Sequence, residues 1–246
     1  MSATGNVEGV KEALQRGGNP NKVTFGRTAL HAAASKGHRE VVAVLLEHPG
    51  VDPNVVTLDT DWSSLHLAVS GGHYKVVALL FQQPGIEVNL PHYIAGWTPL
   101  HIAAIFGACP DMVEILLKQP GININARDRE GWTALHRAAR YDHEEILGLL
   151  LDQPGIDEKA TTNSGASVLH AAVHYSGGPN VLRRLLTSPN TDPNVRDNQG
   201  LTPIMYLLNR TDNPDQVKRL QAMVEFKRVD LDLHPPEGAS LEDLAR

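Results

Sequence analysis

The chain has 246 residues and a formal net charge of −6 at pH 7, because 28 acidic side chains outnumber 22 basic ones. Binding to a phosphate backbone depends on clustered Lys and Arg, so this balance argues against nucleic acid as a partner. The single cysteine excludes an internal disulfide framework, and the longest apolar run, residues 41–46, is far too short to cross a membrane. The first residues resemble no signal segment, so we expect a cytoplasmic protein, with the nucleus as a second location.

A six-residue phrase returns six times along the chain, five times ending in Leu-His and the last time ending in Ile204-Met205. Successive phrases begin 35, 35, 35, 34 and 35 residues apart. Self-similarity at such a period indicates stacked supersecondary units and no single globular core. The phrases start near residues 26, 61, 96, 131, 165 and 200.

Each phrase predicts the start of a first helix. The Gly at its beginning suits a hairpin position with positive φ, and the Thr or Ser two residues later can cap a helix. Pro99 and Pro203 follow their capping Thr directly, where a missing N–H costs nothing. Small residues after the first five phrases, paired alanines in four of them and Ala68 in the second, keep one helix face thin, which favours close stacking of neighbouring units.

A second, Val- and Leu-rich helix follows about one turn later in each unit. It is expected to end at a Pro-Gly or Pro-Asn pair, because Pro cannot continue a helix and Gly or Asn tolerates a left-handed turn. The chain then crosses to the next hairpin. These pairs begin at Pro49, Pro84, Pro120, Pro154 and Pro189.

The pattern Gly-x-Thr-Pro-Leu-His-x-Ala-Ala, with Gly-His and a later Asp-x-Asn, resembles the ankyrin repeat. The resemblance implies an all-α solenoid of helix-turn-helix repeats joined by hairpin loops, with about six full repeats plus caps. We expect an N-terminal capping half-repeat at 1–25, the repeats at 26–212, and a C-terminal capping helix with a tail at 213–246. The last residues, 238–246, fit either a degenerate final repeat or the start of an interrupted one.

Twelve histidines raise the question of a metal or catalytic site. Eight of them fall on two repeat positions, so they are spread one per layer, whereas metal ligands must converge on one point. We therefore expect helix-start histidines that bond neighbouring backbone, with no metal and no cofactor. Phosphate loops, metalloprotease motifs and nucleophile elbows are missing from the sequence, so we predict that the protein is not an enzyme.

The residue between Gly and Thr carries the sharper signal, because the ankyrin resemblance places it on the concave side. All three tryptophans of the chain stand there in successive layers, about 10 Å apart if they follow helix packing. They either cover the inner surface as packing or anchor a partner, and exposed aromatics with Arg favour the partner. The predicted partner-binding residues are Trp62, Trp97, Ile105, Phe106, Trp132, Arg140, Tyr141, His174 and Tyr175.

An asparagine follows most of the Pro-Gly turns. In the ankyrin family its role is structural, since its amide can tie one hairpin to the next. Its context also resembles sites of the asparaginyl hydroxylase that inhibits hypoxia-inducible factor: a Leu eight residues before and an acid two before. Asn54 and Asn194 have both features, and Asn125 has the Leu alone. We expect incidental hydroxylation there, and intact-mass measurement after incubation with that enzyme tests it.

Together these features predict a monomeric, non-catalytic scaffold that binds a protein or peptide on a concave aromatic face. The alternative is an inhibitory or targeting ankyrin module of a larger signalling or ubiquitin-pathway protein. A longer native transcript would favour that alternative.

Overall fold

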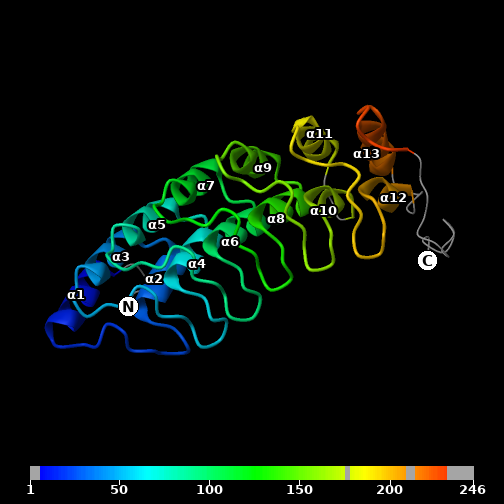
Figure 1. Cartoon of the computed structure of the whole chain (residues 1–246). Coiled ribbons are helices and arrows are strands. Elements are labelled where there is room, and N and C mark those ends of the chain that lie inside the picture. Colours follow the sequence, from blue (N-terminus) through cyan, green and yellow to red (C-terminus); the bar gives the residue numbers. More distant parts are fainter. Residues whose placement is uncertain (1–5, 175–177, 209–213, 232–246) are drawn as a thin grey trace. The chain divides into compact units, whose positions relative to one another are not determined.

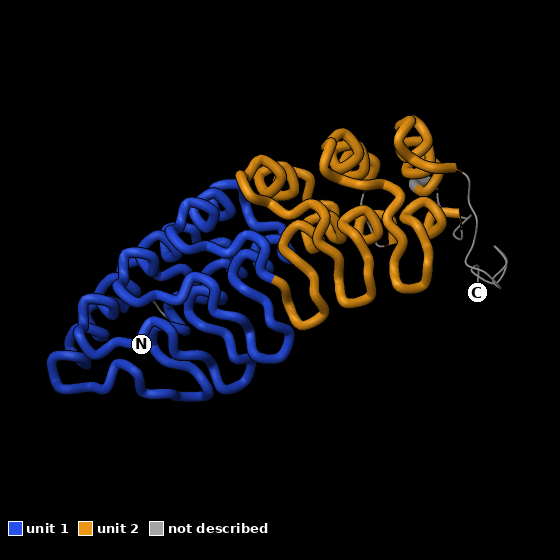
Figure 2. Tube along the Cα trace, in the orientation of Figure 1, with its two compact units in different colours: residues 1–126 blue, residues 127–246 orange. Residues whose placement is uncertain are grey.

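Short helices in pairs, joined by hairpin loops, make up the computed structural model, which describes residues 6–174, 178–208 and 214–231. Their contacts divide the chain into two units, Met1–Ala126 and Arg127–Arg246 (Figure 2). In the described part only isolated β-bridges occur, such as Thr24 with Arg27 at the base of a hairpin. The predicted all-α architecture of helix pairs joined by hairpin loops is therefore confirmed in each unit.

The first unit holds two rows of helices. In one row α2, α4 and α6 pack in succession, and in the other α1, α3, α5 and α7 do the same (Figure 1). The bounds are α1 Val7–Gln15, α2 Ala29–Lys36, α3 Arg39–Leu46, α4 Ser64–Ser70, α5 Tyr74–Leu80, α6 Pro99–Phe106 and α7 Pro110–Leu117. Since α1 packs on α3, it takes the place of a second helix.

The second unit repeats this arrangement. Helices α8, α10 and α12 form one row, and α9, α11 and α13 form the other. The bounds are α8 Ala134–Arg140, α9 Glu144–Leu151, α10 Val168–His174, α11 Pro179–Thr187, α12 Pro203–Leu208 and α13 Pro214–Val224. The last helix, α13, lies within the range 213–246 expected for a C-terminal capping helix, and it begins with Pro214, a residue well suited to a first helical turn.

The first helices begin at the predicted caps. Thr28 accepts a hydrogen bond from the backbone N–H of His31 (3.3 Å), and His31 Nδ1 accepts one from the N–H of Thr28 (3.1 Å). The same reciprocal box starts α4, α6 and α8. Each box satisfies two backbone donors that a helix start would otherwise leave exposed.

Two positions where glycine is absent show how strongly the hairpins and turns demand a left-handed residue. Asp61 stands where the other phrases have Gly, and it adopts φ 53°. Asp142 replaces the Gly between the two helices of its repeat and adopts φ 60°. Short polar side chains tolerate this region best among non-glycine residues, so the repeat geometry is kept.

The core of each unit lies between its two rows and consists of Leu, Val, Ile and Ala. The paired alanines, for example Ala103 and Ala104 in α6, are completely buried. Their small side chains let neighbouring first helices approach closely. In the described residues no helix is long and apolar enough to cross a membrane.

Candidate functional site

In the first unit the aromatic residues predicted on the concave side gather around a histidine. The ring of His92 lies 6.3 Å from that of Trp62 and 5.8 Å from that of Trp97. Trp62 also meets Phe106 edge to face at 6.3 Å, and Phe106 is 54% exposed. Both tryptophans and Ile105 are half-buried. The pair Trp62–Phe106 therefore offers apolar surface to solvent, while His92 is buried against Trp62.

Sequence reasoning missed His92, which belongs to neither of the repeated histidine positions. It lies in a hairpin, where its Nδ1 accepts a hydrogen bond from the N–H of Ala95 (3.1 Å). What marks His92 as part of this aromatic group is its burial between the indoles of Trp62 and Trp97. That signal exists only after folding, because Trp62 and His92 are distant in the chain.

In the second unit Trp132 differs from the expected open anchor, because it is only 8% exposed. The guanidinium carbons of Arg137 and Arg140 lie 4.7 Å and 5.2 Å from its ring centre. In these cation–π contacts the two arginine side chains cover the indole ring. Tyr141 is 40% exposed, stacks on His143 and lies 5.4 Å from Arg140. The accessible aromatic ring of this group is therefore Tyr141, and Arg140 contacts both this ring and that of Trp132.

Arg137 owes its fixed position to a buried ion pair. Its Nε donates to Asp128 Oδ2 at 3.1 Å, and its Nη2 donates to the same oxygen. The other oxygen, Oδ1, accepts from the backbone N–H groups of Glu130 and Trp132 at 3.0 Å and 2.9 Å. The carboxylate of Asp128 thus joins the hairpin to α8. It also holds the Arg137 guanidinium against the ring of Trp132.

One repeat later, two small residues leave a hollow. Ala166 occupies the position that is Trp132 before it and Leu201 after it, and Ala171 occupies the position of Arg137 and Tyr206. The space that larger side chains would fill has a volume of about 380 Å³. Its lining consists of Trp132, Ser164, Ala166, His170, Ala171, His174, Asp197, Asn198, Gln199 and Tyr206.

The walls of this hollow, which we call the Ala166 pocket, are aromatic and fixed. Tyr206 packs edge to face on His174 and His170, at 5.1 Å and 5.7 Å between ring centres. Its hydroxyl donates to Asp197 Oδ2 at 2.5 Å. Asp197 Oδ1 accepts from the N–H groups of Gln199 and Leu201 at 2.9 Å and 3.0 Å. Because both carboxylate oxygens of Asp197 already accept hydrogen bonds, one from Tyr206 and the other from its own hairpin, the pocket presents aromatic walls under a polar rim.

Of the predicted contact residues in this unit, His174 lies in the Ala166 pocket and Tyr175 lies outside the described residues. Arg140 is half-buried over Trp132 and does not line the Ala166 pocket. Sequence reasoning missed Tyr206 and Asp197. The sixth phrase has Met205 in place of His, so the repeat around α12 does not stand out in the sequence. The signal in the sequence is Ala166 itself, an interruption in a series of large side chains.

The repeated histidines at the helix starts form hydrogen bonds with backbone groups. Nδ1 of His66 accepts from the N–H of Ser63 at 3.2 Å, so Nε2 must carry the proton, and it lies 3.2 Å from the carbonyl oxygen of Trp97 in the next repeat. His31 and His170 bridge in the same way to Val55 and Leu201, at 2.8 Å and 2.9 Å. Clusters of three or more metal-ligating side chains are not found among the described residues.

Burial controls the protonation of these rings. Loss of hydration lowers the pKa of His66 and of His136 to about 4, and it also lowers the pKa of His31 and His170. Carbonyl acceptors oppose this effect without cancelling it. The neutral imidazole, which has one acceptor and one donor, is thus the form that the repeat needs.

The asparagines after the Pro-Gly turns act as staples between repeats. Asn54 Nδ2 donates to the carbonyl of Gly85 (2.8 Å), and its Oδ1 accepts from the N–H of Glu87 (2.9 Å). Asn194 does the same with Arg228 and Asp230, both at 2.8 Å. This is the tie expected from the sequence, whereas hydroxylation of Asn54, Asn125 and Asn194 stays a prediction.

Comparison with known proteins relates this architecture to a known repeat family. The family described as ankyrin repeats in three copies matches residues 1–92 and 89–163, and the single ankyrin repeat matches residues 164–198. No curated protein sequence matches the chain. Among solved structures, the chain is similar to that titled the ankyrin repeat domain of Bcl-3, a unique member of the IkappaB protein family. The identity is 24%, the TM-score is 0.72, and the match covers 89% of this chain and 95% of that one.

Proposed function

Because the chain belongs to the ankyrin-repeat family, whose repeats are general protein–protein interaction modules, we propose that it binds a protein or peptide partner through the Ala166 pocket. The observation that carries this proposal is the pairing of Ala166 and Ala171 between layers with larger side chains. The resulting hollow is large enough for one or two apolar side chains of a partner. Its volume falls in the range of small-ligand pockets.

Rigidity favours this use of the pocket. Tyr206, Asp197 and the hairpin backbone are already linked by hydrogen bonds, so they lose little conformational freedom when a ligand enters. Aromatic side chains around a fixed hollow are typical of binding hot spots. Asn198 and Gln199 at the rim are exposed and would add polar contacts around the apolar anchor.

The pair Trp62–Phe106 in the first unit is proposed as a contact of the same kind, since it exposes apolar aromatic surface. Repeats of this family are typically non-catalytic, which agrees with a binding role. We further propose that the chain acts as a monomer, in the cytoplasm or the nucleus, without a cofactor. The likeness to the Bcl-3 domain concerns the fold alone, and 595 matching chains of solved structures show how widely the fold is used.

The test fills the pocket. Ala166→Trp places in this layer the side chain that Trp132 already has in the layer before, so the backbone position accepts it. Immobilised wild-type protein and this variant are each exposed to a cell lysate, and the captured proteins are compared by mass spectrometry. Glu145→Ala, at an exposed position of α9, is the matched control.

We expect at least one protein captured by wild type and by Glu145→Ala to be lost with Ala166→Trp, while the thermal melt stays the same. An identical set of captured proteins with all three would refute the proposed pocket. Trp132→Ala is less suitable, since that indole is buried and its removal would disturb folding.

A further inference from the structure

One repeat of the described chain lacks the asparagine staple described above. Besides Asn54 and Asn194, Asn21 and Asn89 each donate to a glycine carbonyl of the next turn and accept from the N–H two residues further on, at 2.6–3.1 Å. In the repeat that follows Pro154 the same position is Lys159. A lysine ammonium has donors and no acceptor, so it cannot make both bonds.

The backbone groups that a staple would hold are left open at this point. By register with the other repeats they are the carbonyl of Asn190 and the N–H of Asp192. Among the described residues neither group has a hydrogen-bond partner. Glu158, one residue before Lys159, instead accepts from the side chains of Asn190 (3.1 Å) and Thr191 (2.8 Å). The two turns are therefore joined beside the open groups and not across them.

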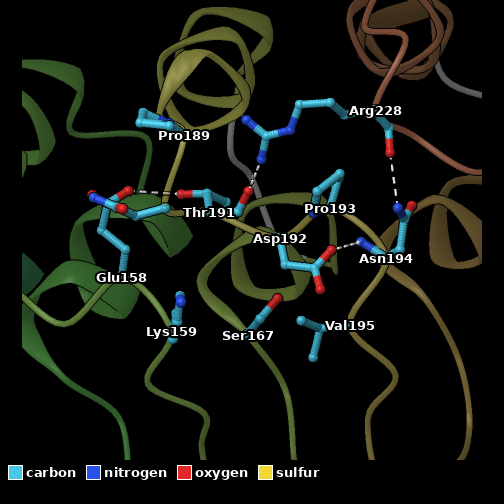
Figure 3. A pocket seen from close by; sticks show the side chains of 11 residues that line it. Glu158, Lys159, Ser167, Pro189, Thr191, Asp192, Pro193, Asn194, Val195 and Arg228 are labelled. Carbon is cyan, nitrogen blue, oxygen red and sulfur yellow. Dashed lines mark hydrogen bonds between the residues drawn. The ribbon is translucent and has the colours of Figure 1, made fainter.

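A cleft of about 520 Å³ lies at this interruption (Figure 3). Its upper edge is Arg228, whose guanidinium donates to the carbonyls of Ser188 (2.8 Å) and Thr191. Asn194 closes another side through the carbonyl of Arg228. Lys159 lies below Thr191 in this view. The frame is thus fixed by its own hydrogen bonds, and it shares no lining residue with the Ala166 pocket.

Charge does not favour an ionic ligand in the cleft. Two acidic side chains, Glu158 and Asp192, and two basic ones, Lys159 and Arg228, are among the lining residues. Both oxygens of Glu158 already accept hydrogen bonds, and the guanidinium of Arg228 is turned to backbone carbonyls. A neutral ligand with one donor and one acceptor matches the open groups.

We propose that this cleft binds the primary carboxamide of an asparagine or glutamine side chain on a partner polypeptide. The carboxamide would donate to the Asn190 carbonyl and accept from the Asp192 N–H, as Asn194 does one repeat later. A primary carboxamide presents its C=O and one N–H on the same edge. A trans peptide bond points them in opposite directions, so partner backbone does not fit.

Nuclear magnetic resonance of the ¹⁵N-labelled full chain tests this with small probes. Propionamide, and the lactam 2-pyrrolidinone with its cis amide, should each shift the Asp192 N–H resonance in a saturable manner. N-Methylacetamide, which is trans, and propionate, which is charged, should not. Equal shifts with propionamide and N-methylacetamide, or no saturable shift with either cis probe, would overturn the proposal.

Two variants at one position make the result specific. Lys159→Asn restores the staple residue, so the propionamide shift should disappear and the melting temperature should rise. Lys159→Ala leaves the open groups as they are, so the shift should persist. A shift that persists in Lys159→Asn contradicts the proposed site. Ala166→Trp should leave the shift unchanged, which separates this cleft from the proposed partner site.

Discussion

The buried histidines predict that the fold weakens between pH 6.5 and pH 4. Burial lowers the pKa of His66 and His136 from 6.5 to about 4, so in this window the unfolded chain binds protons that the folded chain does not. Stability is therefore complete above pH 6.5 and decreases as the pH falls towards the folded pKa. Each pH unit costs about 1.4 kcal/mol per histidine.

At pH 5 the loss is about 2 kcal/mol for each of these two residues, or about 4 kcal/mol together when the whole chain unfolds in one step. His31 and His170 act in the same direction, because their pKa values are lowered as well. The pKa of Asp59 is lowered from 3.8, so its protonation lies below this window. The measurement is urea unfolding followed by circular dichroism at pH 7.5, 6 and 5.

The matched control is the double variant His66→Met/His136→Met, since the sixth repeat has Met205 at this position. It should be less stable than wild type at pH 7.5, because bonds such as His66 to Trp97 are lost. Its further loss between pH 7.5 and pH 5 should be smaller than that of wild type by about 4 kcal/mol. A flat wild-type profile, or the same loss in both proteins, would refute the reasoning.

Three further changes test the packing. Met205→His should stabilise the fold by about 1 kcal/mol and so raise the melting temperature, because the new imidazole can bond Thr202 Oγ1, which is buried without a hydrogen-bond partner. A lower melting temperature would contradict this. Arg137→Ala should cost about 3–5 kcal/mol in urea unfolding, since it leaves the buried Asp128 carboxylate unpaired, and a loss below about 1 kcal/mol would show that the pair is unimportant. Asn54→Ala should cost about 1–2 kcal/mol through two lost staple bonds, whereas Lys159→Ala, which breaks none of the staple bonds, should cost almost nothing; equal losses would exclude the staple argument.

Much of the fold is visible in the sequence because its causes are local. The cap, the Leu-His pair and the Pro-Gly turn all act within a few residues, as the Thr28–His31 box shows. The spacing of the phrases then fixes the repeat. The structural role of the histidines also follows from their one-per-layer spacing, without knowledge of their contacts.

The candidate sites depend on residues that are far apart in the chain. The sequence marks Ala166 as an interruption, but the hollow exists only because Trp132 and Tyr206 lie on either side of it. The sequence shows Trp132 as an aromatic like Trp62, but Arg137 covers it only because Asp128 holds that arginine in place. Likewise Lys159 is an ordinary exposed residue until its neighbours in the next repeat are known.

The sequence by itself determined the repeat, its helices and the backbone-bonding role of its histidines, because short-range hydrogen bonds and the period encode them. The tertiary structure decided which aromatic side chains stay accessible and where the stack is open. Those properties depend on the volumes and hydrogen bonds of residues about 30 to 40 positions apart, which meet only when one repeat packs on the next.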